Sequence, residues 1–286
     1  MAALVEERRS QVCLGLDPDP SKLSGSAPDV ATATAAERAA MAVVTHCRLL
    51  IEQAGPACVA VKPQLACFER LGAPGWSALA EVCEAAGDAG LLVIADGKRG
   101  DVPVTAAAYA QALVGETPTP WGPVAGLGAD AFTANPLLGS DALEPLVEAA
   151  ASAGAGVFAL VRTSNPGAAD LQDQPTPERP LHERLAELVD GLSSRLLGSA
   201  GLSGMGAVVG ATAPEHIGRL RSLMPRSIFL IPGVGAQGGR PEALGPAFSA
   251  GPASALVAAS RGIAAAEDPG TAAENLRSAV WDVSTA

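Results

Sequence analysis

The stretch Val93-Ile94-Ala95-Asp96-Gly97-Lys98-Arg99-Gly100-Asp101-Val102 places two aspartates and a lysine directly after a short apolar run. An apolar run of about four to eight residues bounded by glycine is typical of a buried strand. Charges at the end of such a strand are costly to desolvate unless they pair. Asp96 and Asp101 beside Lys98 would favour the charged lysine, which suits proton donation or contact with a substrate anion. A surface ion-pair turn is the simpler alternative.

Seven other short apolar runs recur along the chain, and helix-like stretches separate them. The eight predicted strands are Gln11–Leu16, Ala57–Val61, Leu91–Ala95, Asp130–Thr133, Gly156–Val161, Met205–Val209, Ile228–Ile231 and Ala255–Ala259. The predicted helices are Ala35–Ala54, Trp76–Ala89, Val104–Val114, Asp141–Ala151, Leu181–Leu197, Pro214–Leu223, Pro241–Ala247 and Gly270–Ser284. This alternation is the pattern of an α/β fold of the (β/α)8 TIM barrel type, whose usual length is ~250 residues. A doubly wound sheet normally has fewer strands, and no GxGxxG follows the first one. We therefore expect a single barrel domain over residues 1–286.

The composition argues against several other classes of protein. The 286 residues are 48% hydrophobic, which is enough for a substantial core, and the net charge of -11 disfavours nucleic acid as a partner. No apolar stretch reaches ~18 residues, and the start lacks the pattern of a signal peptide, so we expect no membrane span and a cytoplasmic protein. The five cysteines form no CxxC pair and the three histidines fall in helix-like segments. We expect neither disulfides nor a metal site.

Polar residues follow each predicted strand, where the active-site groups of a TIM barrel are found. Lys62 ends the apolar run Ala57-Cys58-Val59-Ala60-Val61, where a buried lysine needs a carboxylate partner. Asp96 and Asp101 are the candidates for that partner. In chain order the polar residues at the strand ends are Asp17, Lys62, Asp96 with Lys98, Asn135, Ser164, Thr212, Gly233 to Gln237, and Arg261.

The last two of these loops have the character of a phosphate site. The seventh contains Gly233-Val234-Gly235-Ala236-Gln237-Gly238-Gly239, and the eighth contains Ser260-Arg261-Gly262. Phosphate sites in such barrels use the loops after strands 7 and 8, where glycines expose backbone N–H groups and an arginine adds charged donors. An ordinary glycine-rich turn is the alternative. The long fifth loop, residues 162–180, is either a lid or binding loop or a disordered segment without a function.

With these features assembled, the chain resembles the orotidine 5′-phosphate decarboxylase family, and in particular its longer bacterial branch. The most specific part is Asp96-x-Lys98-x-x-Asp101-Val102-x-x-Thr105, preceded by Lys62 on the earlier strand. Asn135-Pro136 and Thr163-Ser164-Asn165-Pro166-Gly167 also fit that branch. Two features depart from the pattern: the segment before the first strand is short for a barrel-bottom cover, and the residues beyond Gly167 receive no role.

The resemblance implies decarboxylation of orotidine 5′-monophosphate to UMP and CO2, the last step of UMP biosynthesis, without a metal or organic cofactor. It implies a homodimer in which each subunit lends two residues to its neighbour's site. The implied roles are Lys98 as proton donor to C6 in an array with Lys62, Asp96 and Asp101; Asp17 and Lys62 at the ribose; Ser164 at the pyrimidine edge; Gln237 between pyrimidine and phosphate; Arg261 at the phosphate; and Asp101 and Thr105 across the dimer interface.

Other functions remain open from the sequence. Sugar-phosphate decarboxylases and synthases of the same barrel superfamily also have an Asp-x-Lys-x-x-Asp motif, with which they hold Mg²⁺ and an enediolate, so dependence on metal separates them. A nucleotide-sensing pseudoenzyme would have lost part of the charged array. A plain phosphate-binding barrel of the indole type would lack the array altogether.

Overall fold

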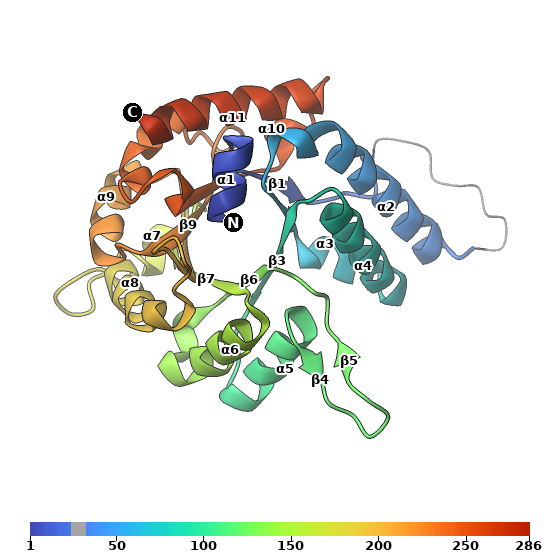
Figure 1. The fold of residues 1–286 in the computed structure, drawn as a ribbon, viewed down its shortest axis with the longest axis horizontal. Helices are drawn as coiled ribbons and strands as arrows, with labels where there is room; N and C mark the ends of the chain where they lie inside the picture. Colours follow the sequence, from blue (N-terminus) through green and yellow to red (C-terminus); the bar gives the residue numbers. More distant parts are fainter. Residues whose placement is uncertain (24–32) are drawn as a thin grey trace.

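Eight parallel strands close into a barrel in the computed structural model, which describes residues 1–23 and 33–286 (Figure 1). Around the barrel the order is β1-β2-β3-β6-β7-β8-β9-β10, so sequential strands are neighbours. The predicted (β/α)8 barrel is confirmed. The barrel strands are β1 (Val12–Leu16), β2 (Ala60–Pro63), β3 (Leu92–Arg99), β6 (Ala131–Ala134), β7 (Gly156–Arg162), β8 (Ser203–Val209), β9 (Ser227–Pro232) and β10 (Ala255–Ala259).

Helices surround the strands as an outer ring. The longer ones are α2 (Ala35–Ala54), α4 (Ala73–Asp88), α5 (Pro103–Leu113), α6 (Ser140–Ala153), α8 (Leu181–Leu192), α9 (Pro214–Leu223) and α11 (Pro269–Thr285). Shorter α-helical turns are α3 (Leu65–Glu69), α7 (Ala168–Leu171) and α10 (Arg261–Ala264). The 3₁₀ segments are η1 (Gly55–Ala57), η2 (Pro136–Leu138), η3 (Ser193–Leu196), η4 (Pro241–Phe248) and η5 (Pro252–Ser254).

The helix boundaries follow local sequence signals. Thr34 and Glu37 form a reciprocal capping box that starts α2 at the predicted residue. The predicted helix Leu181–Leu197 is wrong at its end, because α8 stops at Leu192 and continues as a 3₁₀ turn. The predicted helix Pro241–Ala247 is wrong in type, because the segment forms a 3₁₀ helix over Pro241–Phe248, with Pro246 inside it.

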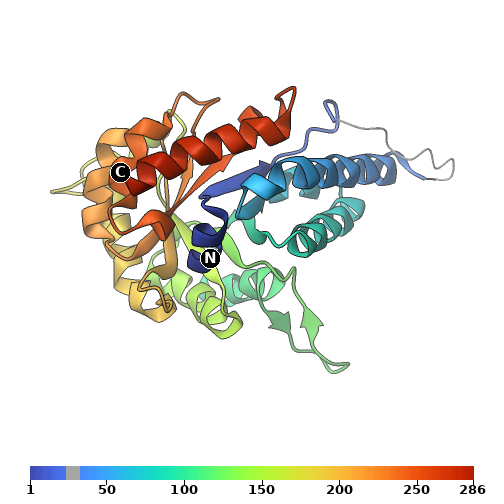
Figure 2. The ribbon, with the colours of Figure 1, turned by 45° about the horizontal axis from the view of Figure 1, so that its top comes forward.

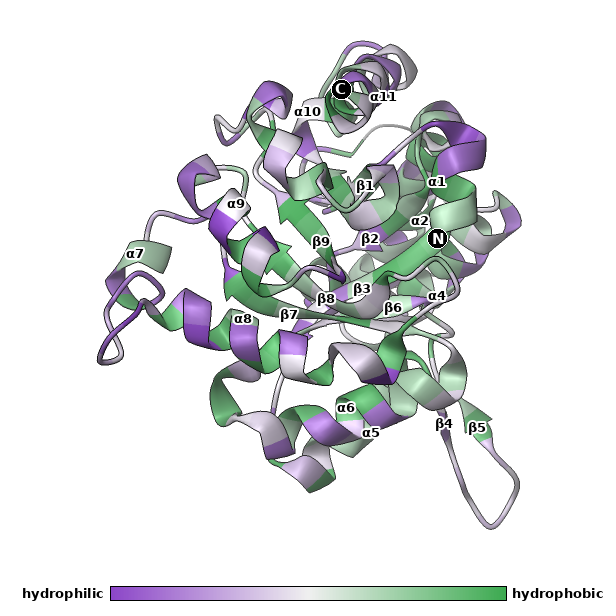
Figure 3. Cartoon of the chain, turned by 60° about the vertical axis from the view of Figure 1, so that its left-hand side comes forward, coloured by the Kyte–Doolittle hydropathy of each residue, from purple (hydrophilic) through white to green (hydrophobic). Residues whose placement is uncertain are grey.

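Apolar side chains fill two layers. One cluster lies between the strands and the surrounding helices and includes Phe68, Phe132 and Phe229. The second fills the barrel interior with residues such as Ile94 and Phe158. The strands are accordingly the most continuously hydrophobic elements in Figure 3. Because both faces of the parallel sheet are covered, its strands read as apolar runs and not as alternating patterns.

A short helix that the sequence analysis did not predict covers the bottom of the barrel. This helix, α1 (Ala2–Arg8), lies across the barrel in Figure 1, and its fully buried Val5 joins the interior cluster. Arg8 Nη1 donates to the Cys58 carbonyl at 2.7 Å and Nη2 to the Gly90 carbonyl at 3.0 Å. These bonds tie α1 to the segments that enter β2 and β3. The short N-terminal segment therefore packs against this end of the barrel.

A second unpredicted element is a hairpin between α5 and β6. Its strands, β4 (Glu116–Thr117) and β5 (Val124–Ala125), pair antiparallel and project from the barrel in Figures 1 and 2. Strands of two residues are too short to give a periodic pattern, which is why the sequence analysis missed them. Among the described residues, no helix has the length and hydropathy needed to cross a membrane.

Candidate active site

Two lysines flank one carboxylate where β2 and β3 end. Lys62 on β2 places its Nζ 2.5 Å from Asp96 Oδ2, and Lys98 on β3 places its Nζ 2.6 Å from Asp96 Oδ1. The pairing of β3 with β6 shifts register between Ala95 and Arg99, and Lys98 has φ +48° there. A non-glycine residue in the left-handed region is uncommon and is held by its surroundings. The chain thus brings two cations to one buried anion.

Two polar side chains that the sequence analysis did not single out complete the surroundings of Asp96. The Thr133 hydroxyl on β6 donates to Asp96 Oδ1 at 2.8 Å and accepts from the Lys98 backbone N–H at 2.8 Å. Gln64 Nε2 donates to Asp96 Oδ2 at 3.2 Å. Both residues lie at strand ends, but nothing in the sequence marks them among the polar residues there. Thr133 therefore fixes both the carboxylate and the strained backbone of Lys98.

The electrostatics of the array keep Asp96 ionised. Burial opposes its ionisation, but attraction and hydrogen bonds from Lys62 and Lys98 outweigh burial and lower the pKa of Asp96 to about 2. Burial likewise disfavours the charged form of Lys62, yet attraction to Asp96 and Asp17 raises the Lys62 pKa above its usual value. The array is therefore a set of fixed charges at neutral pH, with one more cation than anion among Lys62, Asp96 and Lys98.

Asp101 and Thr105 lie outside this array in the single chain. Within the described ranges of this one chain Lys98 pairs with Asp96 alone, and of the two candidate carboxylates it is Asp96 that pairs with Lys62. Asp101 lies beyond the end of β3, where its carboxylate accepts the Val102 N–H at 2.7 Å. Thr105 is exposed on α5. Neither residue lines the cavity described next.

A cavity of about 460 Å³ opens at the carboxyl ends of the strands. The array forms one side of it, and the loops after β7, β9 and β10 form the other. Parallel strands of a closed barrel end on the same rim, which is why residues distant in sequence meet there. Seven of the nine predicted site residues line this cavity, namely Asp17, Lys62, Asp96, Lys98, Ser164, Gln237 and Arg261.

The loops opposite the array are joined to one another. Ser164 Oγ donates to Gln237 Oε1 at 2.9 Å, and Thr212 Oγ1 donates to the Ser164 carbonyl at 2.9 Å. Gly233 has φ +100°, and a Cβ there would lie 3.1 Å from Ser164 Cβ, so both the conformation and the close approach favour glycine. Residues of the Gly233 loop and Arg261 line one cavity, as a phosphate site requires.

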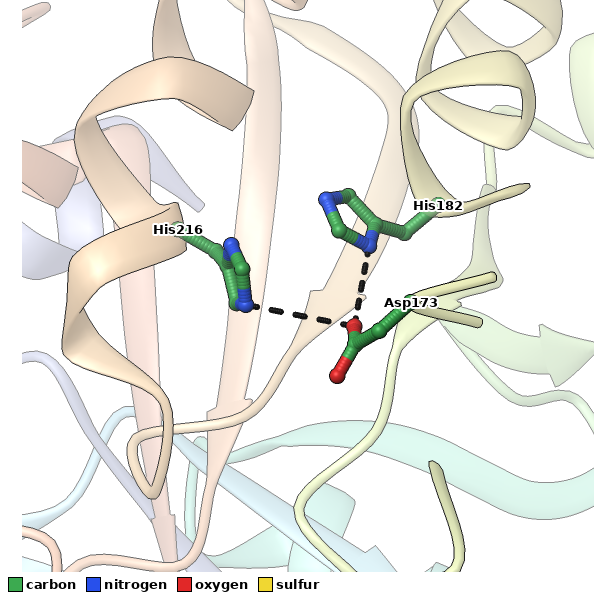
Figure 4. A group of neighbouring side chains, drawn as sticks. All are labelled: Asp173, His182 and His216. Carbon is green, nitrogen blue, oxygen red and sulfur yellow. Dashed lines mark hydrogen bonds and ion pairs between the residues drawn. The ribbon is translucent and has the colours of Figure 1, made fainter. Parts of the chain in front are cut away.

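Asp173, His182 and His216 form a group whose ligand atoms lie close enough to hold a metal ion (Figure 4). Their atoms are committed to other contacts. His182 Nδ1 lies 2.8 Å from the Gln172 carbonyl oxygen, which can only accept, so Nδ1 bears the proton and offers no lone pair. Arg162 donates to both carboxylate oxygens of Asp173. The donor set therefore suits a hydrogen-bonded cluster better than a cation.

Comparison with known proteins gives a consistent result. The sequence matches the Orotidine 5′-phosphate decarboxylase / HUMPS family over residues 10–276. It is 42% identical over 257 residues to orotidine 5′-phosphate decarboxylase of Rhodopirellula baltica, covering 89% of this chain and 83% of that protein. It is 43% identical over 262 residues to the protein of the same name from Deinococcus radiodurans, covering 90% of this chain and 84% of that protein. The solved structure of Leishmania donovani UMP synthase matches with a TM-score of 0.78 and 36% identity, over 100% of this chain and 57% of that one.

Proposed function

Because the chain belongs to the Orotidine 5′-phosphate decarboxylase / HUMPS family, we propose that it converts orotidine 5′-monophosphate to UMP and CO2, the last step of UMP biosynthesis. The observation that carries this proposal is the Lys62–Asp96–Lys98 array on the wall of the barrel-mouth cavity. A cation beside a buried anion, opposite loops suited to phosphate, matches a substrate with a carboxylate at one end and a phosphate at the other.

In the proposed reaction Lys98 acts on C6 of the pyrimidine. The bond between C6 and the carboxylate carbon breaks, CO2 leaves, and the electron pair stays on C6 in an orbital that the ring delocalises poorly. The Lys98 ammonium stabilises that charge and donates one proton to C6, which gives UMP; the neutral lysine then regains a proton from solvent. Its contact with Asp96 at 2.6 Å places the ammonium before the reaction begins.

Asp96 serves two purposes in this proposal. It fixes both ammonium groups, and its carboxylate, ionised because its pKa is about 2, would repel the substrate carboxylate and relieve that repulsion as CO2 leaves. The larger share of the rate enhancement is assigned to electrostatic stabilisation of the carbanion, because the ammonium is in place before the charge develops.

The remaining cavity residues bind the parts of the substrate that do not react. We assign the ribose hydroxyls to Asp17 and Lys62, and the phosphate to Arg261 and the backbone of the Gly233 loop. Ser164 contacts the pyrimidine edge, and Gln237 bridges from there towards the phosphate. The hydrogen bond between Ser164 and Gln237 supports this arrangement because it already joins the two binding loops. Binding energy from the remote phosphate can thus assemble the site around C6.

We also propose a homodimer in which Asp101 and Thr105 reach the neighbouring site. Two exposed apolar side chains on the same segment of the chain support an interface: Val104 on α5 is 85% exposed, and Trp121 in the hairpin that follows α5 is 92% exposed. In a two-fold dimer, mixing inactive Asp101→Ala and Lys98→Ala subunits leaves one intact site in each heterodimer, which predicts recovery of about a quarter of wild-type activity. No recovery on mixing would count against shared sites.

The cytoplasm is the proposed location. All five cysteines are free, and four of them are buried. Burial raises the pKa of these thiols, to about 12 for Cys13 and Cys83, which keeps them in the unreactive protonated form. Unpaired thiols are typical of proteins that work in a reducing compartment.

The metal-dependent alternative fits the array less well. In that reading the carboxylates would coordinate Mg²⁺, a hard cation that takes oxygen ligands. Both Asp96 oxygens already accept hydrogen bonds from an ammonium group, with Thr133 and Gln64 as further donors. Binding a divalent cation there would displace two lysines and gather like charges.

The test is a cofactor-free assay. Purified protein is incubated with orotidine 5′-monophosphate and EDTA, and loss of the orotate absorbance is followed. Rapid formation of UMP is expected. Absence of turnover with EDTA, together with turnover of a sugar phosphate when Mg²⁺ is added, would contradict the proposal and favour the metal-dependent members of the family.

A further inference from the structure

We infer that Asp173 is a positioning residue that fastens the β7 loop (residues 163–172) beside the cavity, so that the loop is ordered before the substrate binds. The inference rests on the proposed function only in assigning this loop to nucleotide binding. Four residues of the segment line the cavity, Thr163, Ser164, Asn165 and Gln172. Asp173 follows the loop directly and lines none of the cavity, so it acts through its neighbours.

Asp173 joins the end of a barrel strand to two helices of the outer ring at one point. Arg162, the last residue of β7, donates from Nε to Oδ1 at 2.8 Å and from Nη2 to Oδ2 at 2.9 Å. His182 on α8 and His216 on α9 approach Oδ1 from the other side, at 3.1 Å and 3.9 Å (Figure 4). A two-bond guanidinium–carboxylate pair is among the stronger polar contacts, and the Arg162 side chain is only 9% exposed. The start and the end of the β7 loop are therefore clamped together.

His182 adds a second fastening. Its ring is buried, and its Nδ1–H donates to the Gln172 carbonyl at 2.8 Å while facing Asp173 Oδ1 at 3.1 Å. Burial, and to a lesser extent His216, lowers the pKa of His182 and so favours the neutral ring, in which Nδ1 keeps the proton that this hydrogen bond uses. One imidazole N–H thus holds the backbone of Gln172 and the side chain of Asp173 together.

The clamp reaches the cavity through the side chain of Gln172. Its Oε1 accepts the Thr163 backbone N–H at 2.8 Å, and its Nε2 donates to Thr163 Oγ1 at 3.0 Å. Thr163 Oγ1 in turn donates to Asn165 Oδ1 at 2.7 Å. Ser164 lies between these two bonded residues, and its own hydroxyl bonds Gln237. Because Ser164 is held from both sides, the position of its hydroxyl depends on the clamp.

The expected consequence concerns affinity and not the chemical step. Ordering a loop on binding costs conformational entropy, and a loop that is already ordered avoids that cost. Loosening the clamp should weaken substrate and product binding about equally, because C6 chemistry occurs at Lys98 on the opposite wall. A change that raises KM while kcat stays constant is the signature of lost uniform binding.

The experiment compares Asp173→Ala, His182→Leu and His182→Asn with wild type. Asn keeps a side-chain N–H donor in place of Nδ1–H, so it should rescue what Leu loses. For Asp173→Ala and His182→Leu we expect KM for orotidine 5′-monophosphate and Kd for UMP to rise about tenfold, with kcat within about twofold. Hydrogen exchange of the free protein should accelerate in residues 163–172. The control Glu144→Ala removes an ion pair of similar length but greater exposure, Arg195–Glu144 at 2.6 Å, whose residues do not line the cavity.

The outcomes separate the two proposals. Unchanged UMP affinity and unchanged hydrogen exchange of residues 163–172 in both Asp173→Ala and His182→Leu would overturn the clamp. A His182→Asn protein as impaired as His182→Leu would also overturn it, because the donor would then be irrelevant. Hydrogen exchange needs no turnover. A wild-type protein that is inactive on orotidine 5′-monophosphate would therefore count against the proposed function, while hydrogen exchange of residues 163–172 would still test the clamp.

Discussion

Two buried cations in this barrel, Lys62 and Arg221, are stabilised in opposite ways. Lys62 is 8% exposed and pairs with the Asp96 carboxylate, and attraction to Asp96 and Asp17 overcomes burial to raise its pKa. Arg221 on α9 is 5% exposed, and within the described residues no carboxylate pairs with it. Its guanidinium stacks 3.7 Å over the Phe229 ring, and burial lowers its pKa to about 10. Its hydrogen-bond acceptors are the carbonyl oxygens of Met224, Ser227, Ala247 and Ser254.

The difference separates a structural cation from one placed for chemistry. Backbone carbonyls accept hydrogen bonds from Nε, Nη1 and Nη2 of Arg221 and join α9 to the segments around β9 and η4, so its charge serves to satisfy backbone acceptors. Lys62 instead lines an open cavity, and its counter-ion Asp96 also holds Lys98. A substrate anion can therefore contact the charges at Lys62 and Lys98, whereas Arg221 serves only to stabilise the fold.

The largest expected effect is the loss of turnover when Lys98 is removed from the array. Lys98→Ala should lower kcat by about 10³-fold or more, since it loses both the proton donor and the charge opposite the carbanion. UMP binding should stay largely intact, because Lys98 contributes little to the product complex. Steady-state kinetics and calorimetric titration with UMP measure the two quantities. Near-normal kcat would refute the assignment of Lys98.

A paired substitution tests the comparison itself. Arg221→Met should lower the free energy of unfolding by about 3 kcal/mol, because four buried carbonyls lose their donors, and should leave kcat unchanged. Lys62→Met should lower kcat/KM by about 100-fold, with a loss of stability of about 1 kcal/mol or less because Asp96 keeps Lys98, Thr133 and Gln64. Urea unfolding and kinetics on both variants give the answer. Equal losses of stability and activity in the two proteins would remove the distinction.

Acid should reveal the charge pairing of Asp96. Its pKa is lowered from 3.8 to about 2 in the folded protein, so the resulting stability is present above pH 4 and is lost as pH falls towards 2. The contribution is about 2 kcal/mol, by the usual conversion of pKa units. Asp96→Asn should therefore show a smaller loss of stability than wild type between pH 4 and pH 2. Parallel stability curves in that range would mean that Asp96 is not paired as described.

The smallest effect is expected for the hydroxyl that supports the array. Thr133→Val keeps the shape of the side chain but removes the donor to Asp96 and the acceptor for the Lys98 N–H. A loss of about tenfold in kcat is expected, equivalent to about 1.4 kcal/mol, close to the value of one hydrogen bond to a charged group. Thr133→Ser should restore most of it. If Ser is no better than Val, the hydroxyl does not position Lys98.

The sequence was sufficient for the barrel because each strand is a separate apolar run. Buried parallel strands need no partner information to be recognised, and the predicted ranges overlap all eight observed strands. The same reasoning failed for α1 and for the β4–β5 hairpin. The role of α1 is its packing against the bottom of the barrel, which only the folded structure shows. The two-residue strands β4 and β5 are too short to give a periodic pattern of apolar residues. Such elements depend on tertiary contacts that a linear pattern does not contain.

The site was predictable to the extent that strand ends converge. Asp17, Lys62, Asp96, Lys98, Ser164, Gln237 and Arg261 meet at one cavity because each follows a barrel strand. The partners of the array were not predictable in the same way. Thr133 and Gln64 are ordinary residues in sequence, and only the register of β2, β3 and β6 brings them to Asp96. Gln172 and Asp173 follow no strand directly, and their contacts depend on how the long loop folds back.

Exchange of the C6 proton of UMP in D2O tests the central claim most directly. Protonation of a carbanion by Lys98 must run in reverse by the same route, so the wild-type protein with EDTA present should replace the C6 proton of UMP with deuterium, as proton NMR would show. Lys98→Ala should bind UMP without exchange. Equal exchange in both proteins, or none in a wild-type protein that decarboxylates orotidine 5′-monophosphate, would contradict the role assigned to the Lys62–Asp96–Lys98 array.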